Sequence, residues 1–141
     1  MTRIYFAGSI RGGRKMADRY RELINLLQSH GKVYTEHVGD DERIKSEFKS
    51  LSDKKIHDRD LEWIRKSDLV VAEVSVPSLG VGYEIARASE LGKPVLCLYN
   101  TSSEHLLSAM ISGSGGVKVI SYDSIQEAKN IVDGYIRDLR S

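Results

Sequence analysis

The chain has 141 residues, enough to bury a hydrophobic core, so we expect a single domain over residues 1–141. Its 21 Lys and Arg nearly balance 20 Asp and Glu, which argues against electrostatic attraction to a nucleic acid polymer. We expect no membrane span and no secretory leader, because no apolar run approaches 18 residues. The single cysteine, Cys97, lies in an apolar run and predicts a buried thiol in an intracellular protein, cytoplasmic or nuclear.

Short apolar runs alternate along the chain with longer segments of helical pattern. The runs that predict strands are residues 3–8, 32–37, 68–74, 93–99 and 117–121. Helices are expected near residues 14–30, 52–66, 80–91, 103–112 and 123–139. The alternation predicts an α/β fold with a doubly wound, mostly parallel five-stranded sheet and helices on both faces, Rossmann-like or flavodoxin-like. The pattern does not give the strand order.

Residues 39–54, with the sequence GDDERIKSEFKSLSDK, are polar and highly charged. They predict a mobile connection that includes some helix. A connection of that length either covers a site or lies solvated on the surface. In a doubly wound sheet the site forms at the carboxyl ends of the strands.

A glycine-rich turn, FAGSIRGGRK, follows the first predicted strand at residues 6–15. The free amides of such a turn, followed by a helix, favour an anion. The turn lacks the G-x-G-x-x-G pattern, and its Walker-like spacing ends in Arg14 and Lys15 without a hydroxyl for magnesium, which disfavours NAD binding and nucleoside triphosphate hydrolysis. Ser9, Arg11 and Arg14 suit a phosphate monoester, although the glycines alone also fit a plain turn.

Two carboxylates fall among apolar residues when the helices are projected at 3.6 residues per turn. Glu84 falls between Ala88 and Leu91, in the first turns of its helix, where we expect the N-terminal amides to stabilise its ionised form. Asp60 falls between Trp63 and Ile64.

Arg59 falls on the opposite, polar side of the Asp60 helix. Because a buried unpaired charge is costly, Asp60 and Glu84 each need either a structural partner or a function. Two acids in different environments suit glycoside chemistry.

Other candidates carry two interpretations each. Tyr5 on the first strand either hydrogen-bonds one of these acids or belongs only to the core. His37, at the end of the second predicted strand, either contacts a ligand or is structural. We expect no metal site, because the four histidines are scattered and neither H-x-x-x-H nor C-x-x-C occurs.

Six blocks of sequence resemble one enzyme family: YFAGSIRGGR, TEHV, IHDRDLEWI, DLVVAEVSVPSLGVGYEIARA, GKPVLCL and LSAMI. They run in register from residue 4 to about residue 112 and closely resemble the 2′-deoxynucleoside 5′-phosphate N-hydrolases, within the wider nucleoside 2-deoxyribosyltransferase superfamily. The resemblance implies hydrolysis of the N-glycosidic bond of a deoxynucleoside monophosphate to free base and 2-deoxyribose 5-phosphate, without a metal or redox cofactor.

The resemblance also implies residue roles. Glu84 would attack C1′, Asp60 would assist departure of the base and proton transfer, and Tyr5 would position Glu84. The substrate-binding set, most of it around the 5′-phosphate, is Gly8, Ser9, Ile10, Arg11, Gly12, Gly13, Arg14, His37, Ser78, Gly80, Ser108, Ala109 and Met110. Ser108 and Met110 would reach the site of the neighbouring subunit in a homodimer.

Three alternatives stay open. A nucleoside 2-deoxyribosyltransferase would share the acids but would not need a phosphate cradle, so Ser9, Arg11, Ser78 and Ser108 favour the hydrolase. A second alternative is an N-glycosidase of ribonucleoside monophosphates. A third is a nucleotide-binding module without catalysis, which the two acids disfavour. The preferred base is not given by the sequence.

Overall fold

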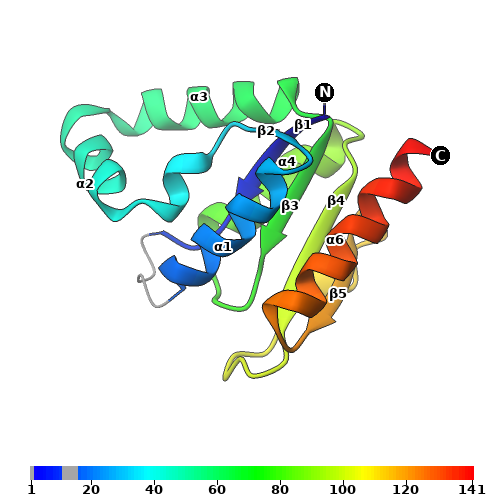
Figure 1. Ribbon diagram of the computed structural model, residues 1–141. Helices are drawn as coiled ribbons and strands as arrows, with labels where there is room; N and C mark the ends of the chain where they lie inside the picture. The colour runs from blue at the N-terminus through cyan, green and yellow to red at the C-terminus, as the bar shows by residue number, and fades with distance from the viewer. Residues whose placement is uncertain (1, 11–15) are drawn as a thin grey trace.

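The structure is a computed structural model that describes residues 2–10 and 16–141 (Figure 1). Five parallel strands form one sheet in the order β2-β1-β3-β4-β5. The strands are β1 (Thr2–Ala7), β2 (Gly31–Val33), β3 (Leu69–Glu73), β4 (Val95–Asn100) and β5 (Lys118–Tyr122). The helices are α1 (Ala17–Gln28), η1 (Glu36–Gly39, a 3₁₀ helix), α2 (Asp41–Ser50), α3 (Asp53–Lys66), α4 (Leu79–Glu90), α5 (Ala109–Ser112) and α6 (Ile125–Arg140).

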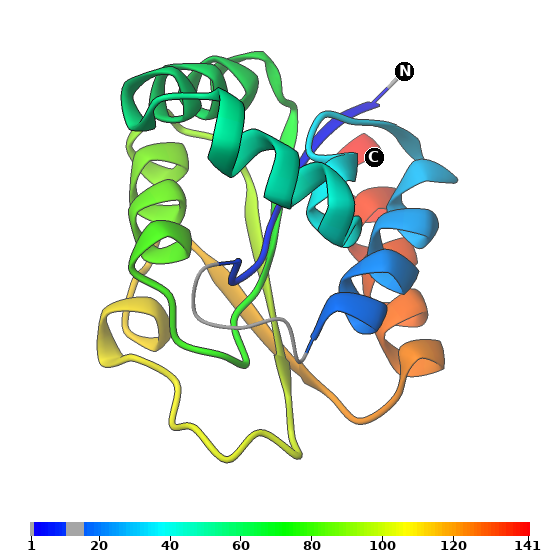
Figure 2. The ribbon, with the colours of Figure 1, turned by 90° about the vertical axis from the view of Figure 1, so that its left-hand side faces the viewer.

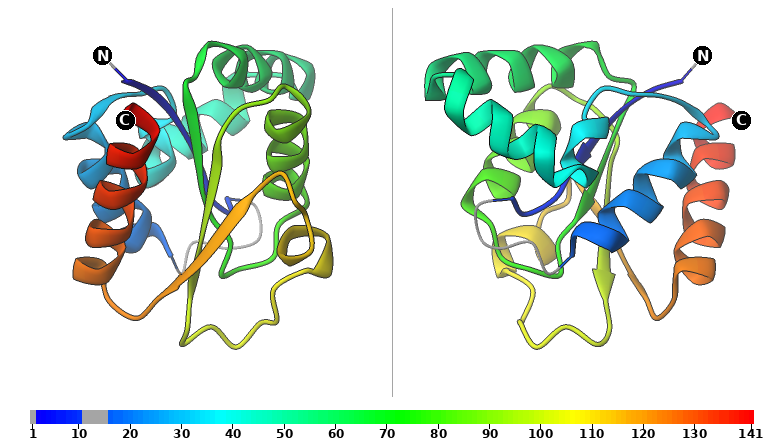
Figure 3. Two further views of the ribbon diagram at one scale, coloured as in Figure 1. Left: turned by 90° about the vertical axis from the view of Figure 1, so that its right-hand side faces the viewer. Right: turned by 60° about the vertical axis from the view of Figure 1, so that its left-hand side comes forward.

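Alternate residues of the central strands point into two separate hydrophobic layers. On one face, Phe6 and Val71 pack with side chains of α1 and α6, and on the other, Tyr5 and Val70 pack with α3 and α4. Figures 2 and 3 show the sheet between these two helix pairs. Strands buried on both faces explain the continuous apolar runs in the sequence. The predicted doubly wound α/β sheet is confirmed.

The strand order places the topological switch between β1 and β3. The chain leaves β1 through α1 toward β2, then crosses back through α2 and α3 to β3 on the other side of β1. The two strands pair in parallel, with Ala7 opposite Ala72, so their carboxyl ends share one edge of the sheet. In this order, 2-1-3-4-5, ligands bind in the crevice at that switch point. The segments that follow β1 and β3 are therefore the expected place for a ligand site.

The prediction of a second strand over residues 32–37, with His37 at its end, is wrong in the length of the strand and in the element that contains His37. The strand ends at Val33, because the Thr35 hydroxyl accepts a hydrogen bond from the Phe6 amide and donates one to the Phe6 carbonyl, at 2.8 Å each. The Thr35 side chain thus takes the place of the next backbone hydrogen bonds between the strands, and the chain continues into η1. His37 consequently lies in a 3₁₀ turn rather than at a strand end.

Two further segments differ from the prediction. The segment 39–54 is more regular than expected, because the Asp40 carboxylate caps α2 by accepting from the amides of Glu42 and Arg43. The helix expected at 103–112 is reduced to α5. The Ser103 hydroxyl donates a hydrogen bond to the carbonyl of Ser75 and so holds the residues before α5 in an irregular path.

The buried thiol prediction is confirmed, since Cys97 has no exposed surface and burial raises the pKa of its thiol to about 12. No described helix has both the length and the apolar character that a membrane crossing requires.

Gly31 supplies a test of the β1–β2 pairing. A Cβ at this position would lie 1.9 Å from the Thr2 carbonyl oxygen, a backbone atom that cannot rotate away. We expect Gly31→Ala to lower the free energy of unfolding by about 1–3 kcal/mol. Gly115→Ala is the control, because nothing lies within 4 Å of its added Cβ. Equal urea midpoints for the two variants would contradict the close approach.

Candidate active site

Tyr5 and Glu84 form a direct contact between the sheet and α4. Tyr5 lies in the middle of β1 with 1% of its surface exposed, and its hydroxyl donates a hydrogen bond to Oε2 of the half-buried Glu84. Glu84 is directed inward because Val81, Ile85 and Ala88 of α4 anchor this side of the helix on the sheet. Both interpretations of Tyr5 therefore hold at once, because it belongs to the core and contacts the acid.

The loss of solvation around the Glu84 carboxyl raises its pKa to about 8. The hydrogen bond from Tyr5 acts in the opposite direction, and the nearby charge of Asp60 raises the pKa further. The expectation that the helix N-terminus keeps Glu84 ionised is wrong, because desolvation outweighs the amides of the first turn. Desolvation therefore favours the protonated form of Glu84 in the free protein.

Asp60 lies on α3, close enough to raise the pKa values of both Glu84 and Tyr5. Its side chain is 21% exposed and forms an ion pair with the Arg59 guanidinium at 3.0 Å. Burial raises the pKa of Asp60, while the positive charge of Arg59 opposes that rise. The structure therefore brings the two predicted acids and Tyr5 into one electrostatic neighbourhood.

His37 lies close to this group through an aromatic cluster. Its ring centroid is 5.7 Å from that of Trp63, one turn beyond Asp60 on α3, and Trp63 also stacks on Tyr34 at 6.2 Å. His37 is 4% exposed, and its Nε2 lies 3.3 Å from Oε2 of Glu47 on α2. Aromatic side chains thus surround the Asp60 region of α3.

The described part of the turn after β1 contains a buried polar atom without a hydrogen-bond partner. Ser9 is 1% exposed, and its Oγ has no partner among the residues that the structure describes, whereas its amide donates to the Tyr20 hydroxyl at 3.0 Å. Gly8 must be a glycine here, because a Cβ would lie 2.9 Å from the Tyr20 ring. Ile10 is half-buried against the α1 layer. The remaining candidates of this turn lie outside the described residues: Arg11, Gly12, Gly13 and Arg14.

Ser78 and Gly80 lie at the start of α4. The Ser78 hydroxyl caps the helix by accepting from the Val81 amide at 3.3 Å, and Gly80 is exposed in the first turn. A helix N-terminus presents free amides and partial positive charge. Because β1 and β3 are neighbours, the Ser9 turn and the start of α4 follow adjacent strand ends and together suit an anion.

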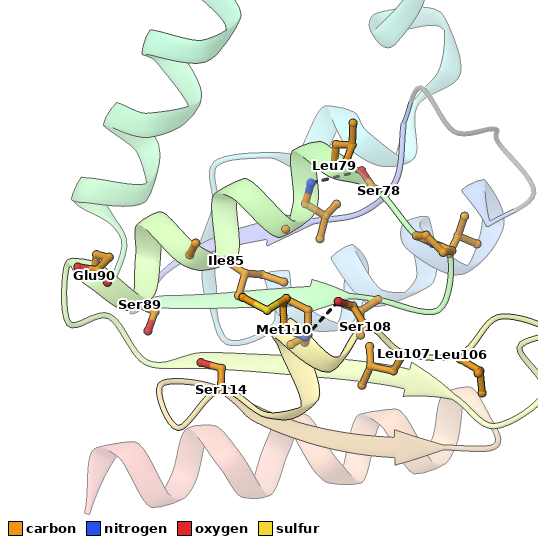
Figure 4. A pocket seen from close by; sticks show the side chains of 17 residues that line it. Ser78, Leu79, Ile85, Ser89, Glu90, Leu106, Leu107, Ser108, Met110 and Ser114 are labelled. Carbon is orange, nitrogen blue, oxygen red and sulfur yellow. Dashed lines mark hydrogen bonds between the residues drawn. The ribbon is translucent and has the colours of Figure 1, made fainter.

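Ser108 and Met110 line a different place. They contribute to a groove of about 730 Å³ between α4 and residues 106–114, which Figure 4 shows from close by. Glu84, Asp60 and Tyr5 do not line this groove, although Ser78 does. Ala109 is exposed and outside the lining. Within one subunit the structure therefore does not bring the α5 residues to the two acids.

Sequence reasoning missed a buried carboxylate at the end of β3. Glu73 has no exposed surface and accepts hydrogen bonds from the Ser75 amide at 2.7 Å, from the Ser75 hydroxyl at 2.9 Å and from the Tyr122 hydroxyl. Burial raises the pKa of Glu73 despite these donors. The carboxylate fixes the start of the loop that leads to Ser78, and its signal in the sequence was an acid inside the apolar run LVVAEV.

Sequence reasoning also misplaced Arg59 and did not single out Glu47. Arg59 is half-buried, with its guanidinium carbon 4.5 Å from the Trp63 ring centroid, and its Nη1 lies 2.7 Å from Oε1 of Glu47.

The described part of the chain contains no group of three or more His, Cys, Asp or Glu side chains suited to a metal ion.

The sequence profile of the nucleoside 2-deoxyribosyltransferase family matches residues 4–134, and the chain belongs to this family. It is 53% identical over 112 residues to the 5-hydroxymethyl-dUMP N-hydrolase of Mus musculus, covering 79% of this chain and 65% of the mouse protein. It is 44% identical over 138 residues to the protein of the same name from Danio rerio, covering 96% of each chain. Both relatives are N-hydrolases by name.

Solved structures share the fold. The CMP N-glycosidase of Clostridium botulinum superimposes with a TM-score of 0.67 at 22% identity, covering 95% of this chain and 99% of that one. A 2-deoxyribosyltransferase from Bacillus psychrosaccharolyticus gives a TM-score of 0.67 at 17% identity, covering 90% of each chain. At these identities the likeness establishes the architecture alone.

The raised pKa of Glu84 makes stability depend on pH. Because the folded protein keeps this proton from about pH 4.5 up to about pH 8, the contribution of Glu84 to the free energy of unfolding falls as the pH rises through that range. Glu84→Gln removes this titration. At pH 9 the variant should melt at a higher temperature than wild type, with a free energy of unfolding greater by an amount on the order of a few kcal/mol, and at pH 4.5 the two should differ little. A melting difference that stays constant across this range would contradict the assignment.

Proposed function

We propose that this chain hydrolyses the N-glycosidic bond of 2′-deoxynucleoside 5′-monophosphates, releasing the free base and 2-deoxyribose 5-phosphate. The observation that carries the proposal is the contact of Tyr5 with Glu84 beside Asp60, on the face of the sheet that α3 and α4 cover, where β1 pairs with β3. The names of the curated relatives support the same reaction. No metal or organic cofactor takes part, and a nucleotide substrate fits an enzyme of the cytoplasm or nucleus.

In the first step, the Glu84 carboxylate attacks C1′ of the sugar. The C1′–N bond breaks, its electron pair goes to the base, and a glutamyl ester of the deoxyribose forms. The transition state resembles an oxocarbenium ion, which an ionised carboxylate stabilises and which a sugar without the electron-withdrawing 2′-hydroxyl reaches more readily. In the second step, water attacks C1′ and passes a proton to Asp60, which is ionised after protonating the base; the C1′–O bond to Glu84 breaks, and Glu84 leaves as a carboxylate.

Asp60 supplies the proton that the departing base needs. Burial raises the pKa of each acid, and the charge of Asp60 raises that of Glu84 further, so the two acids titrate as a coupled pair. The productive arrangement has Glu84 ionised and Asp60 protonated. The hydrogen bond from Tyr5 favours this arrangement, because it lowers the pKa of Glu84.

The 5′-phosphate is held by the turn after β1 and the start of α4. The unpartnered buried hydroxyl of Ser9 supports this assignment, as do the capping hydroxyl of Ser78 and the exposed backbone at Gly80. Hydroxyl and amide donors at a helix N-terminus match a phosphate monoester. Arg11 and Arg14 would add positive charge. His37 and Trp63 would contact the base.

A homodimer completes the site. Large apolar side chains stand in solvent around the α4–α5 groove, with Leu79 97%, Leu106 93% and Met110 83% exposed. Figure 4 labels Leu79, Leu106 and Met110 among the side chains that line this groove. Exposed side chains of this kind favour burial against another surface. A second copy would cover them and carry Ser108 and Met110 toward its neighbour's substrate, which one subunit alone does not do.

The reaction is tested by product analysis. The wild-type protein is incubated with four deoxynucleoside and four ribonucleoside monophosphates, with the unphosphorylated nucleosides, and with or without a second base. We expect free base from deoxynucleoside monophosphates and slow release without the phosphate. Glu84→Gln should lower base release by at least about a thousandfold while monophosphate binding survives, because a nucleophile is lost.

The same panel separates the alternatives. A new nucleoside formed with the second base would identify a transferase, and equal release from ribonucleotides would identify a glycosidase without deoxy preference. Binding without any base release would identify a non-catalytic module. Full activity of Glu84→Gln would remove the role given to this residue.

The homodimer is tested by light scattering and activity together. We expect Leu106→Asp to yield a monomer with base release reduced at least about tenfold, because a charge cannot be buried in the apolar interface. Leu139→Asp is the matched control, because Leu139 is also exposed but lies at the end of α6, away from the groove. A fully active Leu106→Asp monomer would contradict the shared site.

A further inference from the structure

We propose that Glu47 of α2 is a positioning residue for the reaction, which acts through Arg59 to keep Asp60 able to hold its proton. The inference rests on the proposed function and adds a role for the segment that connects η1 to α3. It is carried by the ion-pair geometry around Arg59, which links two carboxylates from different helices.

Arg59 divides its guanidinium between the two acids. Nη1 lies 2.7 Å from Oε1 of Glu47, while Nη2 and Nε each lie 3.0 Å from Oδ1 of Asp60. The side chains are largely shielded from water, with 25% exposure for Arg59, 21% for Asp60 and 18% for Glu47. At such exposure the charges interact more strongly than a surface pair does.

The guanidinium is held in this orientation by its surroundings. It lies over the Trp63 ring, with 4.5 Å between the guanidinium carbon and the ring centroid, in a cation–π contact. The second carboxylate oxygen of Glu47, Oε2, lies 3.3 Å from Nε2 of His37, which is itself tilted over Trp63. Glu47 thus ties α2 to η1 and α3 at the same place.

Charge balance gives the consequence for Asp60. Glu47 neutralises Arg59, so the cation stabilises the ionised form of Asp60 less than it would alone. The other charged or titratable groups that act on Asp60 are His57 on its own helix, Glu84 on α4 and Tyr5 on β1. Burial raises the pKa of Asp60, Arg59 lowers it and Glu47 raises it again. Glu47 therefore favours the arrangement in which Asp60 carries the proton.

The test compares Glu47→Gln, Arg59→Gln and wild type by the pH dependence of kcat/KM for base release from a deoxynucleoside monophosphate. In Glu47→Gln, Arg59 acts on Asp60 without opposition, so the acid limb should move to lower pH. The plateau should fall about threefold or more, because less of the enzyme holds the productive proton arrangement. Arg59→Gln should move the acid limb to higher pH. A loss of structure in the two variants would not move the acid limb of the pH profile in opposite directions.

A second measurement does not depend on turnover. The carboxyl ¹³C resonance of Asp60 is titrated in the free protein, where we expect its midpoint to fall in Glu47→Gln and to rise in Arg59→Gln. Glu42→Gln is the matched control on α2, since it removes an exposed carboxylate elsewhere on the helix and should leave both readouts unchanged.

An unchanged Asp60 midpoint in Glu47→Gln and Arg59→Gln would overturn the inference, whether or not the protein releases base. A shifted midpoint together with full activity of Glu84→Gln would overturn the proposed function and leave the electrostatic link between Glu47 and Asp60 established.

Discussion

The site depends on a carboxyl group that the fold withdraws from water. Glu84 lies on the inward side of α4, and desolvation raises its pKa to about 8. A carboxyl group in this position needs a polar contact, and Tyr5 supplies it from the centre of β1. Because Tyr5 is buried in the core, it cannot move away from this contact without disturbing the sheet. The reactivity of Glu84 is thus tied to the packing of α4 against β1.

The topology explains why the remaining groups gather there. The Ser9 turn follows β1 and α4 follows the segment after β3, and these two strands are neighbours at the switch of the sheet. The long crossing from β2 to β3 carries η1, α2 and α3, and so brings His37, Glu47 and Asp60 to one region. Buried Glu73, bonded to Ser75, fixes the loop before α4. The proposed phosphate site and the two acids thus come from segments around this one switch point.

Helical periodicity was sufficient to place Glu84 and Asp60 on the apolar sides of their helices, because an acid among apolar residues is visible in the sequence alone, whereas the roles proposed for them came from the family resemblance. The strand pattern likewise predicted the parallel sheet, since strands buried on both faces are continuously apolar. Periodicity failed for Arg59, whose long side chain leaves the polar side of α3 and folds over Trp63. It also failed at residues 32–37, where the hydroxyl of Thr35 replaces a ladder rung. The elevated pKa of Glu84 depends on desolvation by packing, which a linear sequence does not reveal.

The central claim is that Glu84 forms a covalent bond to the sugar, and mass spectrometry of the enzyme quenched with acid during early turnover tests it most directly. With a deoxynucleoside monophosphate as substrate, the account predicts 2-deoxyribose 5-phosphate on the peptide that contains Glu84, with one base released per site in an initial burst. Glu84→Gln should show neither. Steady release of base with an unmodified peptide at every time point would mean that water attacks C1′ directly, and would contradict the account.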